Sequence, residues 1–114
     1  MSLDSDTVLD LLGDAVVREI LVAAGRRPTS VRTLADECNA AQSTIYDHVS
    51  DLVEAGLLTE HTRIDPDGNH HRVYETAVDR LRLDVGADGL DLDAEAIGDP
   101  SDRVDDLWDE VAED

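Results

Sequence analysis

The chain has 114 residues, and 28 acidic against nine basic residues give it a formal net charge of −19 at pH 7. This length predicts one domain with a modest core, and a single cysteine excludes an internal disulfide. The N-terminus lacks the basic and apolar regions of a signal peptide, and no apolar run approaches the roughly 18 residues of a membrane helix. We therefore expect a cytoplasmic protein with no membrane partner.

The composition suggests a cause for the extreme charge. All nine basic residues are arginine, and aspartate outnumbers glutamate by 20 to 8. An acidic surface normally argues against DNA binding, because the phosphate backbone attracts basic proteins. In molar salt, however, the Debye length falls to about 3 Å, so like charges hardly repel and carboxylates hold water and bound cations. We expect a salt-adapted protein; an acidic DNA mimic or disordered tail fits less well, because the apolar pattern is regular.

Two helices are expected before the first proline. The first covers residues 5–12, and Asp14 caps a second over 15–24. Pro28 cannot sit inside a helix, so residues 25–28 are expected to form a break. These helices should pack beneath the unit that follows and supply part of a dimer contact.

The central stretch, residues 31–58, predicts two helices joined by a tight turn. The first covers 30–38, with Thr29 or Ser30 as its N-cap, and the second covers 42–55. Both carry apolar residues on one face at the spacing i, i+3, i+4, i+7. These residues are Val31, Leu34, Ala35 and Cys38 in the first helix, and Ile45, Val49, Leu52 and Val53 in the second.

A hairpin is expected directly after the second helix. Gly56 can adopt the left-handed conformation that ends a helix. Residues 58–64 and 70–76 are extended in character, and the turn cluster DPDGN at 65–69 separates them. Two helices packed at a steep angle and followed by a hairpin make a helix-turn-helix with a wing, whose second helix lies in the major groove of DNA.

Taken in order, these motifs resemble the pattern of a known protein family. The chain reads LAxxC, then STIYDHVxxLxxAGLL, then a DPDG hairpin and VYE. Over residues 9–83 it resembles the winged helix-turn-helix regulators of archaea, which are related to the ArsR and MarR superfamily, and it is most similar to the small haloarchaeal regulators. Those regulators often have arginine where this chain has Asp47 and His48. Asp47 can accept from cytosine N4 or hold a cation that bridges to phosphate, and it can also weaken binding.

Two further elements are expected beyond the wing. Residues 80–85 and 90–93 alternate polar and apolar side chains around a turn, which predicts a second hairpin. Asp99 and the proline after it start an amphipathic helix over 100–112. Its apolar stripe can cover the chain's own core or pair with its copy in a second subunit; we favour the homodimer, because small readers of two-fold DNA sites are usually dimers. The expected dimerisation residues are Val104, Leu107, Trp108 and Val111.

The expected fold class is therefore α+β, a winged helix-turn-helix with a β-hairpin wing, a second short hairpin and a C-terminal amphipathic helix. Residues 1–83 form the DNA-binding part, and residues 84–114 form an acidic hairpin and dimerisation helix within the same compact unit. Residues 84–114 carry 13 acids and one base, whereas residues 26–83 carry ten acids and seven bases. The segment expected to touch DNA is thus close to neutral.

The burial face of the 42–55 helix defines its outward side. Gln42 can read adenine through two amide contacts, and the hydroxyls of Ser43 and Thr44 can donate to phosphates or bases. Tyr46 can reach a phosphate or a thymine methyl. An ordinary solvated helix face is the competing interpretation. The DNA-binding residues expected on this helix are Gln42, Ser43, Thr44, Tyr46, Asp47, His48 and Ser50.

Basic side chains flank this helix in the sequence. Arginine entering a minor groove is a common wing contact, and arginines near the start of the motif can hold the DNA backbone. Pairing with nearby acids is the alternative at each position. The wing candidates are Arg63, His70, His71 and Arg72, and those near the start of the motif are Arg26, Arg27 and Arg32.

Metal and catalytic sites are not expected. Some ArsR-type regulators bind metals through cysteine and histidine, but the paired-cysteine motif is missing, and His61, His70 and His71 lack a clear fourth ligand. Cys38 occupies an expected buried position, where thiols are usually inert. The chain has no nucleophile–base arrangement and no phosphate-binding glycine loop, so we expect no enzyme and no cofactor.

These features favour a homodimeric transcriptional regulator of a halophilic archaeon that binds specific sites on double-stranded DNA. Two alternatives stay open: a winged-helix module that docks on the transcription or replication machinery, and a repressor that responds to a metal or another ligand.

Overall fold

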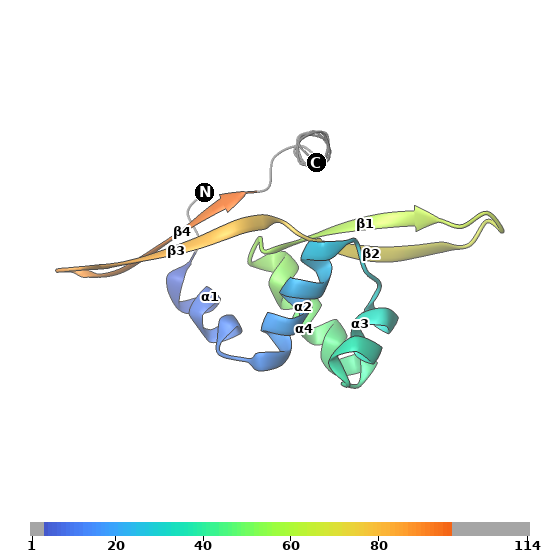
Figure 1. Ribbon diagram of the computed structural model, residues 1–114, viewed down its shortest axis with the longest axis horizontal. Helices are drawn as coiled ribbons and strands as arrows, with labels where there is room; N and C mark the ends of the chain where they lie inside the picture. Colours follow the sequence, from blue (N-terminus) through green and yellow to red (C-terminus); the bar gives the residue numbers. More distant parts are fainter. Residues whose placement is uncertain (1–3, 97–114) are drawn as a thin grey trace, which may run out of the picture.

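A computed structural model describes residues 4–96, which form four helices followed by two antiparallel hairpins (Figure 1). The helices are α1 (Ser5–Leu12), α2 (Ala15–Arg26), α3 (Val31–Cys38) and α4 (Gln42–Glu54). The strands are β1 (Leu58–Ile64) and β2 (His70–Thr76), which form the wing, and β3 (Val78–Gly86) and β4 (Gly89–Ala96), which form the second hairpin. The helices make one layer, and the two hairpins lie across it and project past it at opposite ends. This is a winged helix-turn-helix of the α+β class, as expected, and none of the described helices is long and apolar enough to cross a bilayer.

The helix starts follow the expected capping. Of the two candidates for the N-cap of α3, Ser30 takes the role, and its hydroxyl accepts from the backbone N–H of Thr33 at 3.2 Å. Helix α2 ends later than expected, at Arg26, so the predicted break at 25–28 was wrong for its first two residues. The residue before a proline disfavours the helical conformation, and Arg27 before Pro28 is indeed extended, with φ −166° and ψ 155°.

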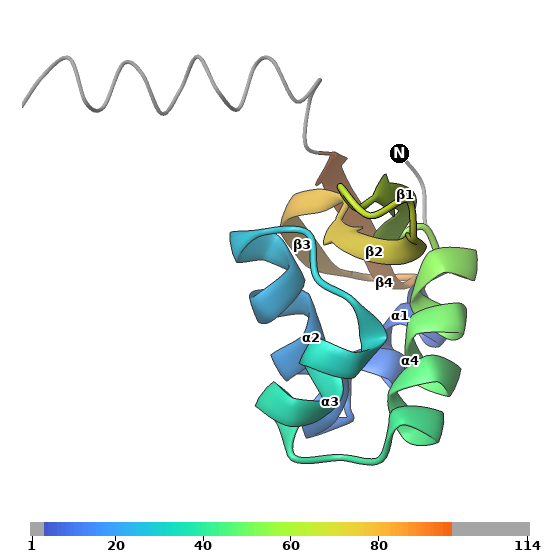
Figure 2. The same ribbon diagram turned by 90° about the vertical axis from the view of Figure 1, so that its right-hand side faces the viewer.

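The apolar side of α4 anchors the core. Ile45, Val49 and Leu52 are at most 1% exposed, and they belong to one cluster with apolar residues of the other elements. The α2 and α3 members of this cluster are Val17, Ile20, Ala24, Leu34 and Ala35. Val31, Cys38 and Val53 are only partly buried, whereas the spacing had placed all three inside. Figure 2 shows α3 and α4 joined by the short connection at the foot of the helical layer.

The wing has the expected bounds, 58–64 and 70–76. Its strands pair in register from Leu58 opposite Thr76 to Ile64 opposite His70. The base of the wing is tied to the loop before α3, because Thr29 and Tyr74 exchange two backbone hydrogen bonds of 2.9 and 2.8 Å. The wing is therefore fixed against the start of α3.

The second hairpin is longer than expected. Pairing reaches from Gly86–Gly89 at the tip to Val78 opposite Ala96 at the base. A single residue, Ala77, separates it from the wing, and the Ala77 N–H donates to the carbonyl of Leu57 at 2.9 Å. The expected helix over 100–112, with Val104, Leu107, Trp108 and Val111, lies outside the described residues.

Two glycine substitutions should have opposite effects on stability. Gly56, which ends α4, has φ +85°, so Gly56→Ala should lower the free energy of unfolding by about 1–2 kcal/mol. Gly25 lies inside α2, and a Cβ there would meet Thr76 Oγ1 at an ordinary contact of 3.7 Å. Gly25→Ala should therefore raise the free energy of unfolding by about 0.5–1 kcal/mol. Urea unfolding at fixed salt measures both, and a shift of both variants in the same direction would contradict this account.

Candidate nucleic-acid interface

The outward side of α4 is open to solvent. Tyr46 is 50% exposed, and among residues 4–96 no hydrogen bond or ion pair occupies the side chains of Gln42, Ser43 or Asp47. His48 differs, because it is half-buried and its Nε2 lies 3.4 Å from a carboxylate oxygen of Asp14. The exposed predicted residues of this helix are Gln42, Ser43, Thr44, Tyr46, Asp47 and Ser50.

Tyr74 of β2 lies buried at the base of the wing. Burial raises the pKa of its phenol above the ordinary value; Glu60 and Tyr46 raise this pKa further, while Arg72 lowers it. Arg72 is also paired with Glu60 across the strands, with its Nε 3.4 Å from the carboxylate.

A second group of predicted residues surrounds a hollow on the other face of the wing. This hollow has a volume of about 560 Å³ and lies between the α2–α3 loop, the first turn of α3 and the wing. Arg63 and His71, which stand opposite each other in the strand register, form its wing side. We call it the basic hollow; its lining residues are Arg27, Pro28, Thr29, Ser30, Arg32, Thr33, Arg63, His71 and Val73.

Among residues 4–96, the arginines of the basic hollow have no acidic partner: none of Arg27, Arg32 and Arg63 has a carboxylate within ion-pair distance. Arg18 and Arg26 have none there either, whereas the arginines of the second hairpin are paired, Arg80 with Glu95 at 3.2 Å and Arg82 with Asp84 at 3.1 Å. Three neighbouring cations without counter-charges make a local positive potential, which an anion such as a phosphate can neutralise.

The structure thus divides the predicted wing residues between two faces. Successive side chains of a strand point to opposite faces, so Arg63 and His71 border the basic hollow, whereas His70 and Arg72 lie on the other face, with Tyr74. The sequence analysis missed the hydroxyls of Ser30 and Thr33, which line the hollow at the start of α3. The N-cap pattern was the available signal, because helix N-termini are suited to anions.

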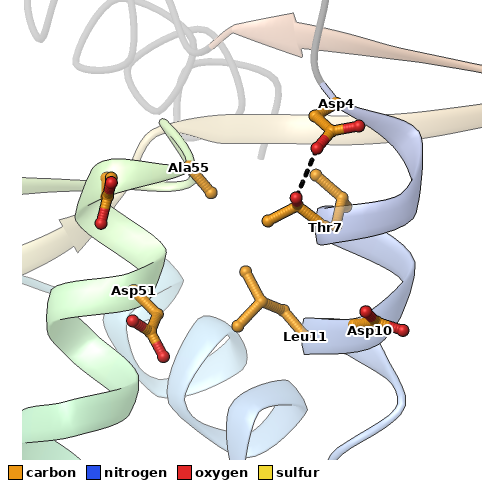
Figure 3. A pocket seen from close by; sticks show the side chains of 8 residues that line it. Asp4, Thr7, Asp10, Leu11, Asp51 and Ala55 are labelled. Atoms are coloured by element: carbon orange, nitrogen blue, oxygen red, sulfur yellow. Dashed lines mark hydrogen bonds between the residues drawn. The ribbon is translucent and has the colours of Figure 1, made fainter.

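The far end of α4 is acidic. A hollow of about 520 Å³ lies between α1 and the last turns of α4, and Figure 3 shows side chains from both helices around it. Four carboxylates line it, those of Asp4, Asp10, Asp51 and Glu54. Asp51 and Glu54 come from the C-terminal half of α4, so its N-terminal half is the less acidic one.

The described histidines and the cysteine form no metal cluster. His61 Nε2 is 3.5 Å from Glu75 and His71 Nε2 is 2.9 Å from Asp65. In the part of the chain that the structure describes, no three histidine, cysteine or acidic side chains gather closely enough to hold a metal ion. Cys38 borders a separate hollow beside α2, together with Glu19 and Glu37.

Comparison with known proteins gives one match. A family model described as a helix-turn-helix domain matches residues 4–61. The matched range contains α1 to α4 and the start of β1, and therefore the whole outward side of α4; most of the wing and the second hairpin lie beyond it. A search of curated proteins found no match.

Cys38 should react slowly with alkylating reagents. Burial raises the pKa of its thiol above the ordinary value, and Glu19 and Glu37 raise it further, so less of the reactive thiolate exists at neutral pH. Iodoacetamide labelling at pH 8 should be several-fold slower in the folded chain than in urea, and the labelling rate should rise at a higher pH. The chain has no second cysteine to confuse the signal. Equal rates in both states would contradict the assigned environment.

Proposed function

Since the chain belongs to the helix-turn-helix domain family, whose model covers half of its length, we propose that it is a sequence-specific DNA-binding transcriptional regulator that acts as a homodimer. Helix α4 lies in the major groove, and the wing reaches the flanking backbone or minor groove. Two subunits address half-sites about one DNA turn, roughly 34 Å, apart. In this proposal residues 1–83 carry the DNA contacts, and residues 84–114 carry the dimer contacts within the same compact unit.

The observation that carries the proposal is the set of unpaired arginines in the basic hollow. Arg27 and Arg32 come from the helix-turn-helix and Arg63 comes from the wing. Contacts from both elements to the same DNA strand would fix the orientation of the protein on the duplex, because phosphate contacts position a protein and base contacts specify the sequence. Arginines without an ion pair also occur outside the hollow, at Arg18 and Arg26, so it is the convergence of three arginines on one site that supports a polyanionic partner.

The rest of the surface fits a cytoplasmic protein of a halophilic archaeon. Residues 84–114 have 13 acids and one base and include none of the proposed DNA contacts. At molar salt, screening acts over about 3 Å, so these carboxylates hardly repel the phosphates and instead bind water and cations. The excess acidity is then compatible with DNA binding at the salt concentration in which the protein works.

One observation favours a different class. Asp47 is exposed in the middle of the proposed reading helix, which suits a module that docks on the transcription or replication machinery without reading DNA. DNA affinity measured across a KCl series separates the two functions. A site reader keeps specific binding at molar salt, with a shallow slope if cations are taken up, whereas a docking module shows no specific binding at any salt.

Substitution of the reading face should remove specificity. Gln42→Ala combined with Tyr46→Ala should abolish specific binding and leave the fold intact, since both side chains are exposed. Gel shifts with genomic fragments recovered by footprinting of the tagged protein measure the effect. Val22→Ala, which truncates a 57% exposed side chain on α2, is the matched control and should bind as the wild type does. An unchanged shift for the double variant would refute the proposed reading face.

Substitution of the basic hollow should weaken binding to all sequences alike. Arg32→Ala and Arg63→Ala should each lower the affinity for specific and non-specific duplexes by a similar factor. Each should also reduce the slope of log K against log salt by about 1. Fluorescence anisotropy over a KCl series measures this, with Arg82→Ala on the second hairpin as the control. A loss confined to specific duplexes would contradict a backbone-contact role.

A further inference from the structure

The second hairpin carries an apolar face that the described chain covers only at its base. Leu92 and Ala94 are 5% and 7% exposed and belong to the core cluster. Toward the tip, Leu83, Val85 and Leu90 are 44%, 81% and 46% exposed. All five lie on one face, because Leu83 stands opposite Leu92 and Val85 opposite Leu90 in the strand register.

Helix α1 covers the base of this apolar face and leaves the part near the tip exposed. Val8 of α1 belongs to the same buried cluster as Leu92 and Ala94, and α1 contacts β4. The hairpin then continues past α1 and projects from the end of the molecule opposite the wing tip (Figure 1). The apolar face of the hairpin therefore continues into solvent. Isolated exposed apolar residues are common, but three that lie side by side on one face form a patch of the kind that marks an interaction site.

We propose that this free part of the hairpin face, made of Leu83, Val85 and Leu90, is the docking surface for residues 100–112 of a second copy of the chain. The inference rests on the homodimer of the proposed function and names the surface that makes it. Residues 100–112 are expected from the sequence to form an amphipathic helix whose apolar stripe contains Leu107 and Trp108. A reciprocal exchange gives each hairpin a helix from the other copy, as two-fold symmetry requires.

The lengths of the segments favour a second copy over the same chain. Three residues, 97–99, join β4 to the expected helix, and they span at most about 10 Å. A helix of the same chain would thus begin level with Ala94 or Leu92, where α1 already covers the face. Leu90 lies six residues from the end of β4, or about 20 Å. A helix from a second copy can approach the projecting tip from the open side.

Size and charge suit this occupant. A 13-residue helix is about 20 Å long, enough to span the strand from Leu83 to the tip at Gly86. The polar side of the hairpin carries acidic groups such as Asp84, Asp91 and Asp93, and the polar side of the 100–112 segment is acidic as well. Apolar contact between the two elements leaves both sets of carboxylates in solvent. Two such contacts in each dimer help a small protein to approach the roughly 800 Å² per partner of a specific interface.

The test uses the full chain in molar KCl and measures molar mass by light scattering over a dilution series. Val85→Arg with Leu90→Glu removes the apolar tip, and the directly opposed charges preserve strand pairing. This variant should raise the dimer dissociation constant at least tenfold, and Trp108→Ala should do the same. The matched control is Arg80→Glu with Glu95→Arg, which reverses an ion pair on the polar side and should dimerise as the wild type does.

A mixture of the two defective variants identifies the contact. The hairpin variant keeps an intact 100–112 segment and Trp108→Ala keeps an intact hairpin, so together they should form a heterodimer with one sound contact. A mixture that stays monomeric would overturn the inference and indicate pairing of like elements. A monomeric wild type with a buried Trp108, seen as blue-shifted fluorescence, would show that the segment covers its own hairpin and would also overturn it.

Anisotropy with genomic duplexes, run on the same samples, separates this inference from the proposed function. A hairpin variant that stays dimeric and binds specific DNA would overturn the docking surface alone. A wild type that dimerises through the hairpin but binds no specific duplex at any salt would overturn the regulator and leave the docking surface in place.

Discussion

The burial of one side of α4 is the constraint on which the rest of the molecule depends. Ile45, Val49 and Leu52 are almost fully enclosed, and a helix has 3.6 residues per turn. Once these three point inward, Ser43, Asp47 and Ser50 have to point outward, and Tyr46 lies at the edge of that side. The wing follows within a few residues of this helix, and the Thr29–Tyr74 backbone pair holds its base against the start of α3. The position of the candidate interface is therefore a consequence of how the core is packed.

The ion pairs are distributed unevenly over the surface. The second hairpin pairs its arginines with its own acids, which leaves it a mixed surface with an acidic excess. Arg27 and Arg32 come from one stretch of sequence and Arg63 from another, and the two stretches converge only in the folded chain. A composition of 28 acids and nine bases says nothing of that convergence. Local arrangement, and not net charge, decides whether such a protein can approach a polyanion.

Local signals in the sequence predicted much of the fold. The turn cluster at 65–69 and the apolar spacing of α4 led to the observed wing and to the observed core residues Ile45, Val49 and Leu52. The length of the second hairpin was underestimated, because at its base the register shifts between Val78 and Arg80, which breaks the simple alternation of polar and apolar residues. The basic hollow could not be predicted as one site, because it depends on which wing face turns toward α3, and strand register alone leaves that open.

The junction between the hairpins has a mechanical consequence. Ala77 is the whole of the connection between β2 and β3, and its N–H is bonded to the carbonyl of Leu57 at the other side of the wing base. A connection of one hydrogen-bonded residue has little torsional freedom, so the two hairpins should move together as one rigid unit. In the proposed homodimer, any tilt at the contact between subunits would therefore pass to both wing tips and change their spacing along a duplex, with no change inside the helical layer.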